Sequence, residues 1–122
     1  MADERAHVLV IEDNEPVSGA LRILFENTNR RVSIAASIAE SIASAQRDPA
    51  KLVLLDLTLP DGNGLDLVEP LKAAGCTTVV ALTGHDDPET RARCLAAGCA
   101  DVLVKPVPAR QLVARASEWL DL

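Results

Sequence analysis

Residues 52–64 read LVLLDLTLPDGNG, and this stretch decides the fold class. Four aliphatic residues run without polar alternation up to the carboxylate of Asp56, and a turn-forming segment with one proline and two glycines follows. An unbroken apolar run of this length is typical of a parallel strand that helices cover on both faces. Asp56 is therefore expected at the carboxyl end of a buried strand, which is where open α/β sheets form their sites.

Four other short runs rich in Val, Leu and Ile flank this stretch. They are His7–Ile11, Val32–Ala36, Val79–Leu82 and Val102–Val104. Segments with helical spacing lie between the runs, and they begin at capping residues such as Asn14, Ser37 and Asp87. Pro70 predicts a late start or a kink in the helix that follows Asp56. The order βα repeats five times, which predicts an α/β fold with a doubly wound, five-stranded parallel sheet.

The composition is that of one domain. The chain has 122 residues, of which 48% are hydrophobic, and a chain of this size buries enough surface to fold without a disulfide or a metal. We expect a single domain over residues 1–122 and no output domain in this chain. A net charge of −6 disfavours direct binding of nucleic acid, which needs a basic face. Aromatic residues make up only 2%, so a base-stacking surface is not expected.

The cysteines and the N-terminus indicate the cellular compartment. Cys76, Cys94 and Cys99 form no CxxC pair, and we interpret them as small hydrophobic residues in a reducing compartment. The N-terminus begins acidic and leads only to a short apolar run, unlike a signal peptide or a membrane span. We therefore expect a cytoplasmic protein that does not contact a membrane.

Polar groups end four of the five predicted strands. They are Glu12 and Asp13 after the first strand, Asp56 after the third, Thr83 after the fourth and Lys105 after the fifth. Carboxylate oxygens with open positions beside them suit Mg²⁺, which also binds phosphate oxygens. A carboxylate can attack phosphorus as a nucleophile, and a hydroxyl and an ammonium can hold the phosphoryl oxygens. The set predicts a site for phosphoryl transfer at Mg²⁺.

Residues 8–13, 52–65, 81–84 and 98–106 read VLVIED, LVLLDLTLPDGNGL, ALTG and GCADVLVKP. Together these motifs resemble the receiver domain of bacterial two-component response regulators, and the resemblance covers nearly the whole chain. It implies the flavodoxin-like (CheY-like) (βα)5 fold with strand order 2-1-3-4-5. It also implies a phosphorelay function, in which a histidine kinase or a histidine phosphotransfer protein supplies a phosphoryl group and the receiver signals through a conformational change.

The resemblance assigns roles to the acidic residues. Asp56 is the implied phosphoacceptor. Asp13 and Asp56 would bind Mg²⁺ directly, whereas Glu12 would act largely through water. Thr58, two positions past the acceptor, would offer its backbone carbonyl to the metal.

The resemblance also assigns roles around the phosphoryl group. Thr83 would donate a hydrogen bond to it, and Lys105 would form an ion pair with it. Gly84 follows Thr83 as a structural position of the switch. The Lys105–Pro106 peptide bond would be cis. His85, two residues past Thr83, stands at a position that in the family lines the mouth of the site and can influence dephosphorylation. The alternative is an exposed loop histidine without a role in the site.

Three positions depart from the family pattern. Val102 stands where the family usually has Tyr or Phe, Val107 stands where Phe is frequent, and Glu12 replaces the commoner Asp. The usual rotation of an aromatic ring, coupled to Thr83, cannot occur at Val102. Either switching uses other groups or it is weak.

The resemblance implies partners on two surfaces. The kinase or phosphotransfer protein would approach the site, and a downstream protein or output domain would contact the surface formed by Glu89–Leu122. The identity of the kinase, the output and the formation of a homodimer stay open. The domain is not expected to be a turnover enzyme, since it takes part only in its own phosphotransfer and slow autodephosphorylation.

Three alternatives share parts of this pattern. A flavodoxin-like flavin carrier would need a phosphate loop rich in Ser, Thr and Gly, where this chain has the acidic residues 12–15. A phosphatase of the haloacid dehalogenase type would need an Asp at the position of Thr58. A receiver-fold scaffold for protein contacts that is never phosphorylated remains the alternative, because Val102 lacks the switch aromatic although the site is complete.

Overall fold

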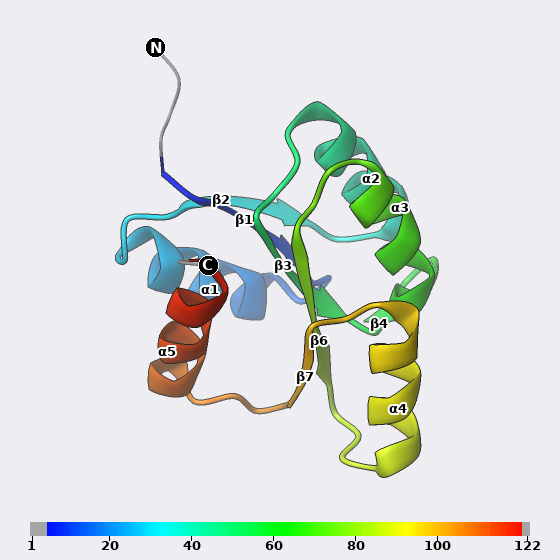
Figure 1. The fold of residues 1–122 in the computed structure, drawn as a ribbon. Coiled ribbons are helices and arrows are strands. Elements are labelled where there is room, and N and C mark those ends of the chain that lie inside the picture. Colours follow the sequence, from blue (N-terminus) through cyan, green and yellow to red (C-terminus); the bar gives the residue numbers. More distant parts are fainter. Residues whose placement is uncertain (1–4, 121–122) are drawn as a thin grey trace.

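The computed structural model describes residues 5–120, and the ends of the expected domain, residues 1–4 and 121–122, lie outside the described part. Five parallel strands form one sheet in the order β2-β1-β3-β6-β7 (Figure 1). The strands are β1 (His7–Ile11), β2 (Arg31–Ala35), β3 (Leu52–Asp56), β6 (Thr78–Thr83) and β7 (Asp101–Val104). Counted within this sheet alone, the order is 2-1-3-4-5, so the predicted fold class is confirmed.

Five α-helices cover the two faces of the sheet. They are α1 (Glu15–Glu26), α2 (Ile38–Arg47), α3 (Val68–Ala73), α4 (Pro88–Ala97) and α5 (Ala109–Leu120). Figure 1 shows α1 and α5 on one face of the sheet and α2, α3 and α4 on the other. Among residues 5–120, the structure has no helix that is long and apolar enough to cross a membrane.

Alternate residues of the central strands supply two separate cores. Leu9 and Val53 pack into the core under α2, α3 and α4, whereas Val10 and Leu54 pack into the core under α1 and α5. Because both faces of each central strand are buried, every second residue cannot be polar, and this is why the runs lack alternation. The first core also holds the three free thiols, those of Cys76, Cys94 and Cys99.

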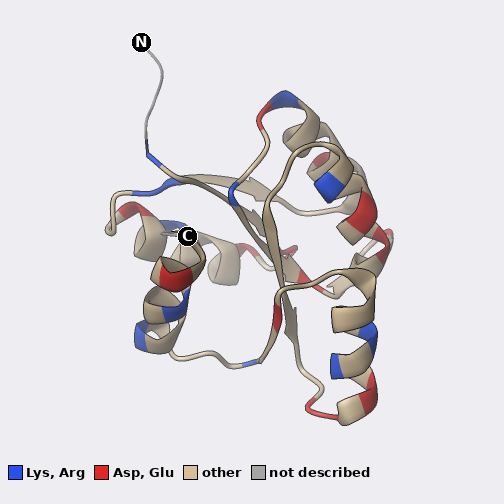
Figure 2. Ribbon diagram, viewed as in Figure 1, with Lys and Arg blue, Asp and Glu red and all other residues tan. Residues whose placement is uncertain are grey.

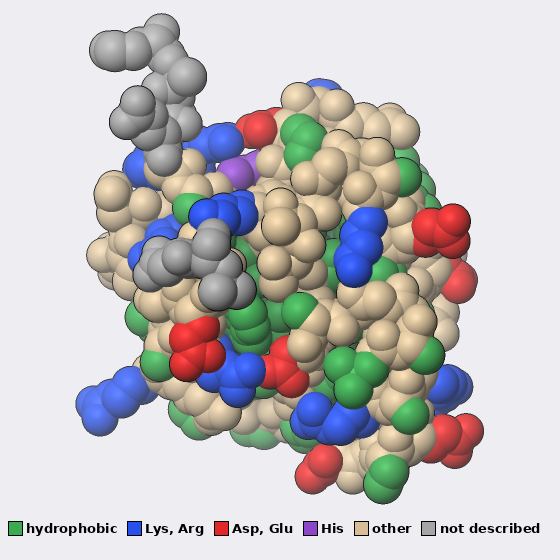
Figure 3. Space-filling view, viewed as in Figure 1, with side chains coloured by type: hydrophobic (Ala, Val, Ile, Leu, Met, Phe, Trp, Pro, Cys, Tyr) green, Lys and Arg blue, Asp and Glu red, His purple; other side chains and the backbone are tan. Residues whose placement is uncertain are grey.

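Charged side chains stay outside these cores. Figure 2 shows Lys, Arg, Asp and Glu mainly on the helices, the loops and the ends of the strands. On the face drawn in Figure 3, hydrophobic side chains at the surface lie in small groups between polar and charged ones. Buried charges such as those of Glu12 and Asp56 are therefore exceptions, and each needs a partner.

The helix boundaries lie where the sequence predicts them. The side chains of Asn14 and Ser37 each accept a hydrogen bond from the backbone N–H three residues further on. Gly98 ends α4 in the left-handed conformation, with φ 112°, which glycine adopts without a steric penalty. Pro70 lies inside α3, and this helix begins late, after the 3-10 turn η1 (Gly64–Leu67).

A short hairpin follows Asp56, in a segment for which the sequence predicts only a turn. Strand β4 (Thr58–Leu59) pairs antiparallel with β5 (Gly62–Asn63). After the hairpin, the backbone returns so close to Asp56 that a β-carbon on Gly64 would lie 2.4 Å from the Asp56 carbonyl oxygen. Glycine at position 64 therefore allows the hairpin to return to the end of β3.

This close approach yields a stability prediction. Gly64→Ala places a methyl group against the Asp56 carbonyl, and it should lower the free energy of unfolding by about 1–3 kcal/mol. Gly19→Ala is the matched control, because a β-carbon on Gly19 of α1 meets nothing within 4 Å. Alanine favours a helix over glycine, so Gly19→Ala should stabilise by up to about 1 kcal/mol. Urea unfolding measures both, and equal effects in the two variants would contradict the role of Gly64.

Candidate functional site

Four strands of the sheet place polar side chains at their carboxyl ends, all on the same side of the sheet. Glu12 directly follows β1, Asp56 ends β3, Thr83 ends β6 and Lys105 directly follows β7. Backbone hydrogen bonds continue one residue past the strands, since the N–H of Glu12 donates to the Ala35 carbonyl at 3.0 Å and that of Lys105 to the Thr83 carbonyl at 2.8 Å. The sheet therefore fixes the backbone at these positions.

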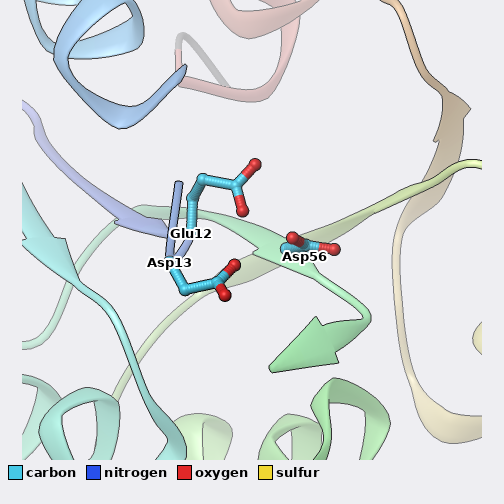
Figure 4. A group of neighbouring side chains, drawn as sticks. All are labelled: Glu12, Asp13 and Asp56. Carbon is cyan, nitrogen blue, oxygen red and sulfur yellow. The ribbon is translucent and has the colours of Figure 1, made fainter. Parts of the chain in front are cut away.

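Three carboxylates form a cluster at this edge. One oxygen each from Glu12, Asp13 and Asp56 lies within 4.8 Å of the others, and Figure 4 shows the three side chains facing a common space. Glu12 and Asp56 are buried, with exposed fractions of 4% and 7%, whereas Asp13 is exposed. The cluster is thus open to solvent on the Asp13 side.

Lys105 brings a cation to the buried pair. Its Nζ lies 3.2 Å from Glu12 Oε1 and 3.2 Å from Asp56 Oδ2. The ammonium donates a hydrogen bond to Glu12, and about a third of the Lys105 side chain is exposed. The Lys105 ammonium therefore bridges the two buried carboxyl groups of the cluster, those of Glu12 and Asp56.

The protonation of the cluster follows from these contacts. Burial, followed by the hydrogen bond and the charge of Asp56, raises the pKa of Glu12 to about 7. Burial also acts to raise the pKa of Asp56, but hydrogen bonds from the Glu12 carboxyl and the Thr58 N–H outweigh it and hold that pKa below its ordinary value. The pKa of Lys105 is raised, because the charge of Asp56 and the bond to Glu12 outweigh its burial. The pKa values of the two buried carboxyl groups therefore move in opposite directions, upward for Glu12 and downward for Asp56.

The donor set of the cluster fits a small divalent cation. All three side chains offer hard oxygen donors from one side only, which leaves positions for water and for ligand oxygens, and Mg²⁺ favours this kind of set. The surrounding cleft measures about 400 Å³. Its lining is formed by Glu12, Asp13, Asn14, Val17, Asp56, Thr58, Gly84, His85 and Lys105.

The structure brings most of the sequence-predicted residues to this cleft but sets Thr83 beside it. The Thr83 hydroxyl is buried and accepts a hydrogen bond from the His85 N–H at 3.1 Å. Thr83 lines a neighbouring cleft together with His85 and Thr58. His85 and Thr58 therefore belong to both clefts.

Two predicted switch positions, Val102 and Pro106, do not line this cleft. The Lys105–Pro106 peptide bond is cis, as the resemblance implies. Val102 is buried in the core under α4 and does not line the cleft. Its carbonyl accepts a hydrogen bond from Arg91 Nη2 at 3.1 Å.

Two residues near the site carry no functional signal in the sequence. Asn14 lines the cleft, but its pattern indicates only a helix cap, which it also is. Asp61 lies in the turn-forming segment after Asp56, and the sequence pattern assigns it no partner. Its carboxylate accepts hydrogen bonds from the N–H groups of Ile38 and Ala39, and no local pattern marks partners more than 20 residues away.

The chain matches known proteins along most of its length. Residues 8–117 match the family model described as the response regulator receiver domain. The TorCAD operon transcriptional regulatory protein TorR of Escherichia coli O157:H7 is 33% identical over 114 residues, which are 93% of this chain and 50% of that protein. The chain therefore spans about half the length of the curated relatives that it matches.

Solved structures agree with the fold and with the acidic cleft. A two-component response regulator from Clostridium difficile has a TM-score of 0.91 at 22% identity, with 96% of this chain and 97% of that chain covered. The receiver domain of sensor histidine kinase PA1611 from Pseudomonas aeruginosa PAO1 has a TM-score of 0.85 at 25% identity, with 97% and 99% covered, and holds a magnesium ion in its active site cleft. Since the family model runs from the first strand into the last helix, this chain belongs to the response regulator receiver domain family.

Proposed function

We propose that this chain is a phosphoacceptor receiver domain of a two-component phosphorelay, with Asp56 as the acceptor. One observation carries the proposal, namely that the Asp56 carboxyl group ends a buried strand and lies between the carboxylate cluster and the Lys105 ammonium. An ionised carboxylate is the nucleophilic form. The phosphoryl donor is a phosphohistidine on a kinase or a phosphotransfer protein.

In the proposed reaction, an Asp56 oxygen forms a bond to phosphorus while the bond from phosphorus to the histidine nitrogen breaks. Asp13 and Asp56 would hold Mg²⁺ with the Thr58 carbonyl, and Glu12 would reach it through water. The bound ion would neutralise charge on the phosphoryl oxygens. Exposed Asp13 leaves the cleft open toward an approaching partner.

The remaining polar groups hold the new phosphoryl group. Lys105 already contacts Asp56 Oδ2. After phosphorylation, its ammonium can pair with the phosphoryl oxygens in place of the carboxylate. The Thr83 hydroxyl accepts a bond from the His85 N–H, which leaves its own hydrogen free to be donated. Gly84 lines the cleft and places no side chain between Thr83 and the phosphoryl group.

The proposed signal leaves through the surface from Glu89 toward Leu122, of which residues 121–122 lie outside the described part of the chain. Arg91 bonds the Val102 carbonyl and lies 3.6 Å from Asp101, and Arg115 of α5 pairs with the same Asp101. These contacts join α4, β7 and α5 where the family usually has an aromatic. We assign the change of shape to this junction, and a downstream protein, an output domain or a second copy would read it.

In this proposal the chain is one receiver domain that acts in the cytoplasm and promotes only its own phosphotransfer and slow dephosphorylation. A second candidate is a scaffold with the receiver fold that is never phosphorylated. The buried aliphatic residue at Val102 favours it, since no ring can couple Thr83 to the output surface. The two candidates differ in one respect, because a scaffold needs no response to a phosphoryl group.

The acceptor assignment can be tested with acetyl phosphate, a small phosphoryl donor. Asp56→Asn removes the nucleophile and should abolish incorporation of phosphate, measured by intact mass. Asp66→Asn is the matched control, because Asp66 is an exposed carboxylate in the turn after the hairpin, and this variant should be phosphorylated like the wild type. Phosphorylation retained by Asp56→Asn at another residue would overturn the assignment.

The metal assignment can be tested without any phosphoryl donor. Mg²⁺ at about ten times its dissociation constant should stabilise the fold by about 1.4 kcal/mol, which corresponds to a rise in melting temperature of a few degrees, roughly 2–8 °C. Asp13→Asn should reduce this rise, because it removes a carboxylate from the cluster. NaCl at matched ionic strength is the control for screening. A melting temperature that Mg²⁺ and NaCl change equally would contradict a metal site.

A further inference from the structure

Asp61 joins the hairpin after the acceptor to a helix that is distant in the sequence. It lies in the turn between β4 and β5, and its two carboxylate oxygens accept hydrogen bonds from the N–H groups of Ile38 at 2.8 Å and Ala39 at 3.2 Å. These two groups open α2. The bonds draw the pKa of Asp61 below its ordinary value, so the carboxylate is negative where the helix end is positive.

The other N–H groups of the first turn of α2 have partners close in the sequence. The N–H of Glu40 donates to Ser37 Oγ at 3.2 Å, and the N–H of Ser41 donates to the Ser37 carbonyl at 3.0 Å. The first turn of α2 is therefore capped by two side chains. Ser37 is the N-cap residue that directly precedes α2, whereas Asp61 belongs to the hairpin.

A second contact holds the same two elements together. A β-carbon on Gly62 of β5 would lie 2.8 Å from the Cδ1 atom of Ile38, which shows how closely the hairpin backbone approaches the start of α2. The two contacts lie at neighbouring positions, Asp61 and Gly62. The hairpin is thus joined to α2 by a pair of hydrogen bonds, and at the next residue its backbone leaves no room for a side chain against Ile38.

The hairpin needs such a support. Each of its strands has two residues, and a two-stranded ladder of this length is not stable by itself in water. Thr58 is exposed, so burial of its side chain does not hold it in place. The N–H of Thr58 donates to Asp56 Oδ1 at 3.1 Å, and its neighbours are held by main-chain bonds of Leu57 and by burial of Leu59. The contacts of the hairpin turn with α2 add to these at the far end of the hairpin.

We propose that Asp61 is a positioning residue for the metal site, which acts by fastening the hairpin to α2 and so holding the Thr58 carbonyl toward the carboxylate cluster. The inference rests on the proposed function, in which that carbonyl binds Mg²⁺. Loss of the Asp61 bonds releases the hairpin turn from α2, and the Thr58 carbonyl is then held less firmly. Groups that orient a metal ligand from outside contribute strongly to metal affinity.

The test compares two ways of weakening the start of α2 in the full chain. Asp61→Ala removes the bonds to Ile38 and Ala39 together with the link to the hairpin, whereas Ser37→Ala removes the local cap and leaves that link intact. Both variants should lower the urea midpoint of unfolding. Only Asp61→Ala should weaken Mg²⁺ binding, by roughly tenfold, measured from amide chemical shifts of Thr58 during a Mg²⁺ titration.

A conservative variant separates positioning from folding. Asp61→Asn keeps one acceptor oxygen, so its Mg²⁺ affinity should lie between those of the wild type and Asp61→Ala. Wild-type affinity in Asp61→Ala, or an equal loss in Ser37→Ala, would overturn the inference alone. A wild-type chain that does not bind Mg²⁺ would overturn the proposed function, and the inference with it.

Discussion

The ammonium of Lys105 lies 3.2 Å from a carboxylate oxygen of Glu12 and 3.2 Å from one of Asp56, and the rest of the site depends on this contact. Two carboxylates buried side by side repel each other and take up protons unless a cation stands beside them. Burial and the neighbouring Asp56 raise the pKa of Glu12 to about 7, whereas the pKa of Asp56 is lowered despite its burial, through hydrogen bonds and the charge of Lys105. The Asp56 carboxylate is thus stabilised in its negative form, in which it would bind a metal ion or attack phosphorus.

The sheet makes this contact possible between residues that are far apart in the chain. Glu12 and Lys105 are 93 positions apart, and they meet because β1 and β7 run in the same direction and end at the same edge. The N–H of Lys105 is fixed by the Thr83 carbonyl, which ties the cation to the strand that carries the hydroxyl. A movement of Thr83 would therefore also shift the backbone of Lys105. Through β7, it would reach Asp101 and its arginine partners.

The fold could be predicted from the sequence because its signals are local. An unbroken apolar run such as Leu52–Leu55 is explained by burial on both faces, and a cap such as Asn14 has its partner three residues away. The meeting of Glu12, Asp56 and Lys105 was also predictable, since parallel strands bring their ends together. The bonds of Asp61 and the close approach at Gly64 were not, because they depend on how a hairpin and a helix pack in space. The bond between Thr83 and His85 was missed for another reason, since a serine or threonine turn leaves only a weak trace in a single sequence.

The central claim is that Asp56, with Mg²⁺, accepts a phosphoryl group and that the output surface responds. The most direct measurement is an NMR titration of the ¹⁵N-labelled chain with beryllofluoride, a mimic of the phosphoryl group, with and without Mg²⁺. We predict new amide resonances for Thr83, Gly84 and Lys105, accompanied by shifts in α4, β7 and α5, only when Mg²⁺ is present. A spectrum that beryllofluoride leaves unchanged in the presence of Mg²⁺ would contradict the account and favour the scaffold.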